Sequence, residues 1–177
     1  TSANAVKIVR ALPNRNIFFI PDRNLARYVA RQVPEKHFLF NEGYCPVHEK
    51  IQIQELLKAK AEHPEAIVLS HPECAEKVLE QSDHIGSTSE IIGYASKSAC
   101  EEFIVCTEKG VRWKLEKDNP GKRFYFTDTE PVCRDMKLNT LDKILHVLKT
   151  GENAVEVDAG LQELSKKPLE RMLELAK

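Results

Sequence analysis

Short apolar runs alternate with longer amphipathic segments along the chain. The runs hold three to five consecutive residues, mostly β-branched, aliphatic or aromatic, as in strands buried on both faces. They predict strands at 16–20, 37–40, 66–70, 84–86, 102–106 and 123–126, with a weaker candidate at 154–157. The segments between them predict helices at 2–12, 22–33, 49–61, 74–82, 88–100, 108–118, 139–149 and 159–176. Such alternation predicts an α/β fold with short parallel sheets covered by helices on both faces.

The same order of elements occurs twice. When the chain is shifted by 87 residues, segment 1–40 falls on segment 88–126 with one residue left over, and predicted strands meet predicted strands although few residues are identical. This match predicts two copies of one α/β unit. Only the second copy is preceded by a further strand and helix, at 66–87, and the chain does not begin with methionine. We therefore expect a fragment, or a chain whose N-terminal part is not included.

Composition narrows the functional classes. The chain has 177 residues, 42% of them hydrophobic and 30% charged, with a formal net charge of −1. There is no basic excess to attract nucleic acid or an anionic membrane. No apolar run approaches the roughly 20 residues that span a bilayer. Because no signal peptide is recognisable, we expect the chain in the cytoplasm.

The five cysteines do not predict a disulfide framework, because their number is odd and they are widely spaced. Cys100 and Cys106 are expected to pack in the core, and Cys74 is expected to be structural. Cys45 and Cys133 differ, since the 87-residue shift places Cys45 beside Cys133, each in a loop after a predicted strand. Ligands bind at the carboxyl ends of such strands, so the two thiols could bind a soft metal or an iron–sulfur cluster. Simple burial is the alternative.

Histidine and carboxylate side chains follow two of the strands. His48 comes three residues after Cys45 and could be a ligand, a base or an ordinary loop residue. His71 and Glu73 directly follow the strand 66–70, where they could perform acid–base catalysis. In the alternative interpretation, Glu73 lies in a turn that starts the next helix.

Hydroxyl residues begin two predicted helices. Ser87 and Thr88 follow Gly86, and Ser2 occupies a similar place in the first copy. Hydroxyls and free helix N–H groups could bind substrate anions, although Ser and Thr are also ordinary N-caps. Arg134 and Lys137 could balance an anionic cluster or could simply be solvated.

Seven stretches together resemble one family along nearly the whole chain. They are "IPDRNLARYVA", "GYCPVH", "SHPEC", "DHIGSTSEII", "EFIVCTEKG", "CRDMKLNTL" and "PLERML". In this order they resemble the bacterial and archaeal quinolinate synthases. The resemblance implies pseudo-symmetric repeats of a three-layer αβα domain, three in the family. Here the second would comprise 1–62 with the closing segment from about 134–177, and the third would be 63–133, while the first would be absent.

The resemblance also implies a cofactor and roles for particular residues. The family holds one [4Fe–4S] cluster on three cysteines, one per domain, so Cys45 and Cys133 are expected ligands and the third would lie upstream. His71 and Glu73 match the family's active-site His-Pro-Glu. The resemblance also implies that Ser2, Ser87 and Thr88 bind the substrate. The family's catalytic tyrosines have no counterpart here, so we do not expect this chain alone to assemble an active site.

The implied reaction condenses iminoaspartate with dihydroxyacetone phosphate to give quinolinate, phosphate and two waters, for de novo NAD synthesis. The cluster would act as a Lewis acid. The implied partners are these small molecules, with a functional link to L-aspartate oxidase and with no nucleic acid or membrane. The alternative from another class is a non-catalytic, duplicated α/β module that binds zinc or mediates interactions.

Overall fold

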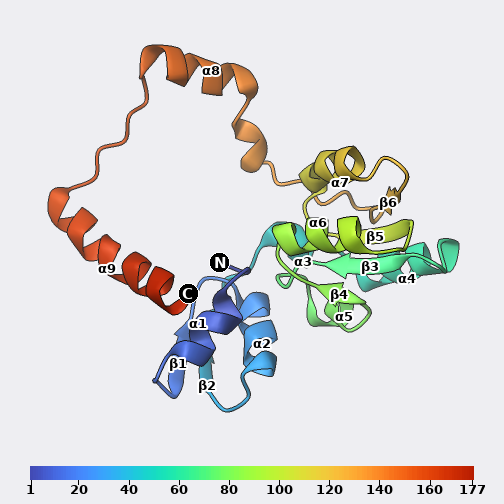
Figure 1. The fold of residues 1–177 in the computed structure, drawn as a ribbon, viewed down its shortest axis with the longest axis horizontal. Coiled ribbons are helices and arrows are strands. Elements are labelled where there is room, and N and C mark those ends of the chain that lie inside the picture. The colour runs from blue at the N-terminus through green and yellow to red at the C-terminus, as the bar shows by residue number, and fades with distance from the viewer. The chain divides into compact units, whose positions relative to one another are not determined.

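The computed structural model describes residues 1–177 and divides them into two compact units, 1–132 and 133–177. The first unit contains all of the strands, and the second contains only helices and loops (Figure 1). The cluster of polar side chains that forms the candidate site lies in the first unit.

The first unit contains fourteen elements that follow one another with short connections. It begins with α1 (Ala5–Ala11), β1 (Asn16–Phe19), α2 (Arg23–Gln32) and β2 (His37–Phe40). It continues with α3 (Pro46–Glu49), α4 (Ile53–Glu62), β3 (Ile67–Ser70), α5 (Glu76–Leu79) and β4 (His84–Ile85). It ends with α6 (Thr88–Lys97), β5 (Glu102–Cys106), the 3₁₀ turn η1 (Lys109–Val111), α7 (Arg112–Asp118) and β6 (Arg123–Tyr125).

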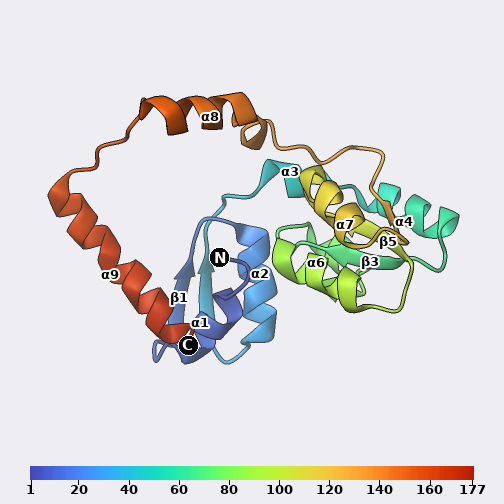
Figure 2. The same ribbon diagram turned by 45° about the horizontal axis from the view of Figure 1, so that its top comes forward.

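The strands form two parallel sheets. β1 pairs with β2 (Figure 2), and the other four strands are arranged in the order β4-β3-β5-β6. In the larger sheet Ile67 lies opposite Phe103, and Glu102 lies opposite Arg123. The predicted α/β class with short parallel sheets is confirmed, and all six principal predicted strands are present within one residue at each end.

Helices cover both faces of the larger sheet. Successive side chains of a strand point to opposite sides, so each strand contributes to two apolar clusters. Val68 and Ile104 pack in one apolar cluster with residues of α4 and α5. Leu69 and Phe103 pack in the other cluster with residues of α6 and α7. All four side chains are fully buried, and burying each stabilises the fold by about 1.5–3 kcal/mol. The result is a three-layer αβα arrangement.

The smaller sheet is covered on one face only. Ile17 packs in an apolar cluster with Val9 of α1 and Val29 of α2. The opposite face carries Phe18 and Leu39, which lie side by side in register and are 67% and 66% exposed. Residues 1–40 thus form two layers, with bare aromatic and aliphatic side chains on the outside.

The predicted repeat corresponds to a repeated order of elements. Helix, strand, helix and strand follow one another in α1-β1-α2-β2 and again in α6-β5-α7-β6. The starts of the two copies differ, however. Ser87 caps α6, whereas α1 begins at Ala5 with Asn4 as its N-cap, so the expectation that Ser2 begins a helix is wrong. The assignment of the 134–177 segment to the first copy stays a prediction.

Several predicted helices are shorter than their patterns, because turns interrupt them. The segment predicted at 49–61 is split into α3 and α4, since the chain turns at 50–52 to bury Ile51. The helix predicted at 74–82 is the single turn α5, and residues 71–75 before it form an irregular loop. That loop supplies part of the candidate site.

The second unit consists of η2 (Met136–Leu138), α8 (Leu141–Thr150) and α9 (Ala159–Leu175). Thr140 caps α8, and Gly151 ends it with a φ of +67°, a left-handed conformation that glycine adopts without strain. The strand candidate at 154–157 is wrong, because no other strand pairs with that segment and Val155 is 86% exposed. None of the helices in the chain combines the length and hydropathy needed to cross a bilayer.

Candidate active site

Three loops bring polar side chains together in the first unit. β3 ends at Ser70 and its neighbour β5 ends at Cys106, so His71 and Thr107 start adjacent loops. The third loop follows β2 and ends at Cys45. Carboxyl ends of parallel strands are the usual place for ligands in α/β folds.

Cys45 and His48 face each other because of a single helical turn. Cys45 is the N-cap residue of α3, and residues three apart lie on the same side of a helix. Contact with His48 lowers the pKa of the Cys45 thiol and outweighs the opposing effect of burial. The thiol is therefore held closer to its thiolate form, which is the form that binds metals.

His48 is buried between two oxygen atoms. Its Nδ1 lies 3.1 Å from Oε2 of Glu73, and its Nε2 lies 3.1 Å from Oγ1 of Thr107. Burial alone would lower the pKa of His48, but contacts with Cys45 and Glu73 raise it to about 9. The same contact with His48 lowers the pKa of Glu73. His48 and Glu73 are thus an imidazolium and a carboxylate near neutral pH.

His71 stacks on His48 but stays neutral. The ring centroids are 4.5 Å apart and the planes differ by 18°. Burial and the neighbouring His48 charge lower the pKa of His71 to about 4. Its Nδ1 accepts a hydrogen bond from the Glu73 backbone N–H, so the ring proton is on Nε2, 3.2 Å from Oγ of Ser2. The two imidazoles therefore differ in charge although they are in contact.

Three of these residues could bind a metal ion. The ligand atoms of Cys45, His48 and Glu73 all lie within 4.8 Å of one another. Once His48 gives up its extra proton, a thiolate, an imidazole and a carboxylate together suit zinc or iron. A [4Fe–4S] cluster needs more thiolates than these residues supply. Of the other cysteines in the first unit, Cys74 and Cys106 are fully buried in the core.

The same chain matches a known family along almost its entire length. Residues 1–174 match the family described as quinolinate synthetase A protein. The chain belongs to this family.

Curated members of the quinolinate synthetase A family give the same result. The chain is 45% identical over 176 residues to the quinolinate synthase of Caldicellulosiruptor saccharolyticus and 47% identical over 176 residues to that of Fusobacterium nucleatum. It is 42% identical over 175 residues to that of Alkaliphilus metalliredigens. Each alignment covers 99% of the chain but 58% of the relative, so the chain spans little more than half the length of these proteins.

Within this family member, the structure brings together most of the residues expected from the sequence. Cys45, His71 and Glu73 meet, and they meet His48, whose role the sequence left open. Ser2 joins them through His71. Glu73 lies in the turn that precedes Ala75, the N-cap of α5, and its carboxylate points to His48.

Of the remaining expected residues, Ser87 and Thr88 belong to the start of α6, and Cys133 belongs to the second unit. Ser87 caps α6 by accepting a hydrogen bond from the Glu90 N–H, while the Glu90 carboxylate accepts one from the Ser87 N–H at 2.7 Å. Thr88 is exposed on the first turn of α6. Cys133 is half-buried at the start of the second unit.

Sequence reasoning missed Thr107, Asp22 and Asn24. Thr107 is 2% exposed and directly follows β5, a position that could have identified it. Asp22 and Asn24 flank the start of α2, where polar residues are usually read only as helix caps. Asn24 in fact donates through Nδ2 to Glu49 Oε2 at 2.7 Å and to the Glu73 carbonyl at 3.0 Å.

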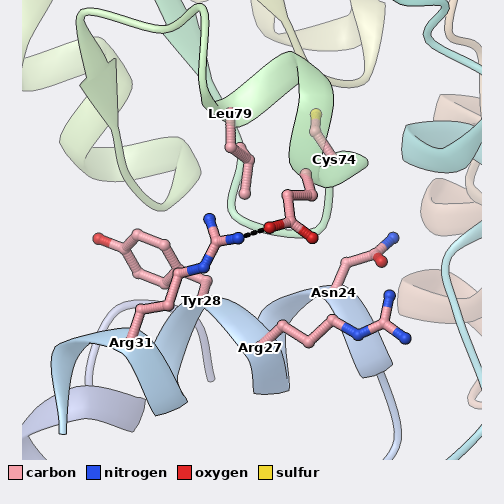
Figure 3. Close-up of a pocket in the computed structure, with 7 residues that line it drawn as sticks. Asn24, Arg27, Tyr28, Arg31, Cys74 and Leu79 are labelled. Carbon is pink, nitrogen blue, oxygen red and sulfur yellow. Dashed lines mark ion pairs between the residues drawn. The ribbon is translucent and has the colours of Figure 1, made fainter. Parts of the chain in front are cut away.

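A narrow cleft lies next to this site, between α2 and the segment 74–79. Figure 3 shows Asn24, Arg27, Tyr28 and Arg31 along α2 facing Cys74 and Leu79, with an ion pair between Arg31 and Glu76. Its free volume is about 10 Å³, hardly room for one water molecule. The cleft is therefore a packing seam and not a substrate site.

Proposed function

We propose that this chain is the acid–base part of a quinolinate synthase. In this proposal the enzyme condenses iminoaspartate with dihydroxyacetone phosphate and releases quinolinate, phosphate and two waters. An L-aspartate oxidase would supply the iminoaspartate. The observation that carries the proposal is the pair of stacked imidazoles, His48 and His71, next to the Glu73 carboxylate and the Cys45 thiol.

The proposed reaction needs groups of both kinds. Each loss of water requires a proton for the leaving hydroxyl and a base for the proton on the neighbouring carbon. His48, as the imidazolium, is the proton donor. Ionised Glu73 is the acceptor, because Nδ1 of neutral His71 already accepts the Glu73 N–H. The two histidines and this carboxylate form a set of groups whose environments separate their pKa values.

Thr107 and Ser2 orient the two rings. Thr107 Oγ1 lies against Nε2 of His48, so the Nδ1 edge of that ring is directed at Glu73. Ser2 accepts from Nε2 of His71 and keeps its own hydroxyl proton for a substrate oxygen. Both hydroxyls hold their imidazole in one orientation, which a proton transfer needs.

The substrate anions belong, in this proposal, near the N-terminus of α6. The Ser87 hydroxyl accepts the capping bond and can still donate its proton to a phosphate or carboxylate. The exposed Thr88 hydroxyl is available beside it. The Glu90 carboxylate already occupies the capping box, so an anion would bind through these hydroxyls and not through the backbone N–H of Ser87.

The proposed cofactor is a [4Fe–4S] cluster. Cys45 fits such a group, since its thiol is half-buried, is favoured as thiolate and lies outside the apolar core. Cys133 is the second proposed ligand, and a third thiolate must come from residues other than those named here. When bound, the cluster would supply a Lewis-acidic iron that polarises a substrate oxygen.

The test uses protein expressed anaerobically from the complete reading frame. We expect a brown protein that contains iron and sulfide and forms quinolinate from the two substrates. Cys45→Ser should lose colour, iron and turnover. Cys100→Ser is the matched control, because Cys100 packs against the cluster of side chains around α6 and should leave all three intact. Full turnover in Cys45→Ser contradicts the proposal.

A zinc-binding module is the second candidate, favoured by the close Cys45–His48–Glu73 set. Colourless protein with one zinc per chain and no quinolinate formation would support it. In that case Cys45→Ser should lose zinc, whereas Cys133→Ser should retain it, because three ligands already come from the first unit.

A further inference from the structure

The loop that presents Cys45 is bound along its length to the segment before α2. Asn41 donates from Nδ2 to the Pro21 carbonyl at 2.8 Å, and the Arg23 N–H donates to the Gly43 carbonyl at 2.8 Å. A Cβ atom at Gly43 would lie only 2.5 Å from the Pro21 oxygen, so the two backbones approach closely. Loop 41–45 therefore has little freedom to move away from residues 21–23.

Asp22 makes the last hydrogen bond between residues 21–23 and loop 41–45. Its Oδ2 accepts from the Cys45 N–H at 2.7 Å, and its Oδ1 accepts from the Leu25 N–H at 2.7 Å. The carboxylate is only 4% exposed. Capping α2 requires one of these oxygens. The second is used on a residue 23 positions further along the chain, in a different loop.

An aspartate here is costly, which points to a purpose beyond capping. Burial raises the pKa of Asp22, and the charge of Glu73 adds to this effect. Asparagine would cap a helix equally well without the buried charge. Its NH₂ group cannot accept a hydrogen bond, however, so it could not hold both N–H groups. Only a carboxylate of this length satisfies Leu25 and Cys45 together.

The bond to Cys45 fixes the start of α3. Cys45 is the N-cap of that helix, and its carbonyl accepts from the Glu49 N–H at 3.0 Å. Glu49 in turn pairs with Arg23 at 2.8 Å. Both ends of the single turn that carries Cys45 and His48 are thus tied to the beginning of α2.

We propose that Asp22 is a positioning residue that holds the Cys45 thiol toward His48 and Glu73 and thereby determines how firmly Cys45 retains a metal. This inference rests on the proposed function for the identity of the metal, but the placement of the loop can be tested without any metal.

Asp22→Ser is the informative variant. A serine hydroxyl can still cap α2 through Leu25, but it cannot also reach the Cys45 N–H. In the metal-free chain we expect the Cys45 amide to exchange with solvent on the order of 10- to 100-fold faster, as for loss of a hydrogen bond to a charged group, while Leu25 keeps its protection. In protein from the complete reading frame, we expect iron to be lost to a chelator about tenfold faster or more.

Asp83→Ser is the matched control. Asp83 also accepts a backbone hydrogen bond, from the Val68 N–H at 2.8 Å, but it lies at the β3–β4 connection. It should reduce stability without changing the rate of iron loss or Cys45 exchange. This control separates a general loss of stability from a loss of positioning.

The outcomes are distinguishable. Wild-type exchange at Cys45 in Asp22→Ser overturns the inference, and so does unchanged iron retention once Cys45 exchange has accelerated. Equal iron loss in Asp83→Ser overturns it as well. Wild-type protein without iron contradicts the proposed function and the metal consequence together, whereas the exchange measurement still decides whether Asp22 holds the loop.

Discussion

The two stacked imidazoles should titrate far apart in the metal-free chain. With ring centroids 4.5 Å apart, two positive charges repel by about 4 kcal/mol at an effective dielectric constant of about 20. Since one pKa unit corresponds to about 1.4 kcal/mol, the second ring should be harder to protonate by nearly three pKa units. The Glu73 carboxylate oxygen is 3.1 Å from His48 Nδ1 and 3.8 Å from His71 Nδ1, so His48 takes the charge.

NMR of the ring Cε1–H signals measures both titrations. We expect His48 to stay protonated up to a pKa of about 9 and His71 to stay neutral down to about 4. Glu73→Gln should lower the pKa of His48, whereas Glu55→Gln, a carboxylate bonded to Thr129 instead, should not. Titration of both rings together near their ordinary pKa value, or a higher pKa at His71 than at His48, would contradict this separation of charge.

Three further predictions concern stability, each measured by urea unfolding of the chain. Asn24→Ala should lower the unfolding free energy by about 2–4 kcal/mol, because two partly buried hydrogen bonds are lost, one of them to a carboxylate, while the exposed Asn16→Ala should change little. Gly43→Ala should destabilise, since its Cβ meets backbone, but Gly93→Ala in α6 meets nothing and should stabilise by about 0.5–1 kcal/mol. Phe103→Ala should cost about 3–5 kcal/mol, and a cost below about 1 kcal/mol would contradict its place in the core.

The strands could be predicted because each is a short apolar run whose local pattern matches its final environment. Phe103, Ile104 and Val105 are all fully buried, and a run without alternation is the signature of a strand with helices on both faces. The wrong prediction of a strand at 154–157 rests on the same kind of local pattern. Alternation at Val155 and Val157 is compatible with a strand, but no partner strand is present to bond its backbone.

The site could be predicted only in part, because the fold, and not the spacing of residues along the sequence, decides which side chains meet. His71 and Glu73 were found from their place after a strand. Thr107 meets His48 across 59 positions, and Asp22 meets Cys45 across 23, so neither contact leaves a local pattern. The charge difference between His48 and His71 follows from their stacking, which no linear motif encodes.

The one-sided β1–β2 sheet has a practical consequence for handling the chain. Phe18 and Leu39 form an exposed apolar surface on β1 and β2. The outer edges of this two-stranded sheet also have no partner strand. Exposed, flat strands of this kind invite edge-to-edge association between molecules. The apparent mass of residues 1–177 measured by light scattering should therefore rise with protein concentration, and Phe18→Lys or Leu39→Lys should keep it at the monomer value.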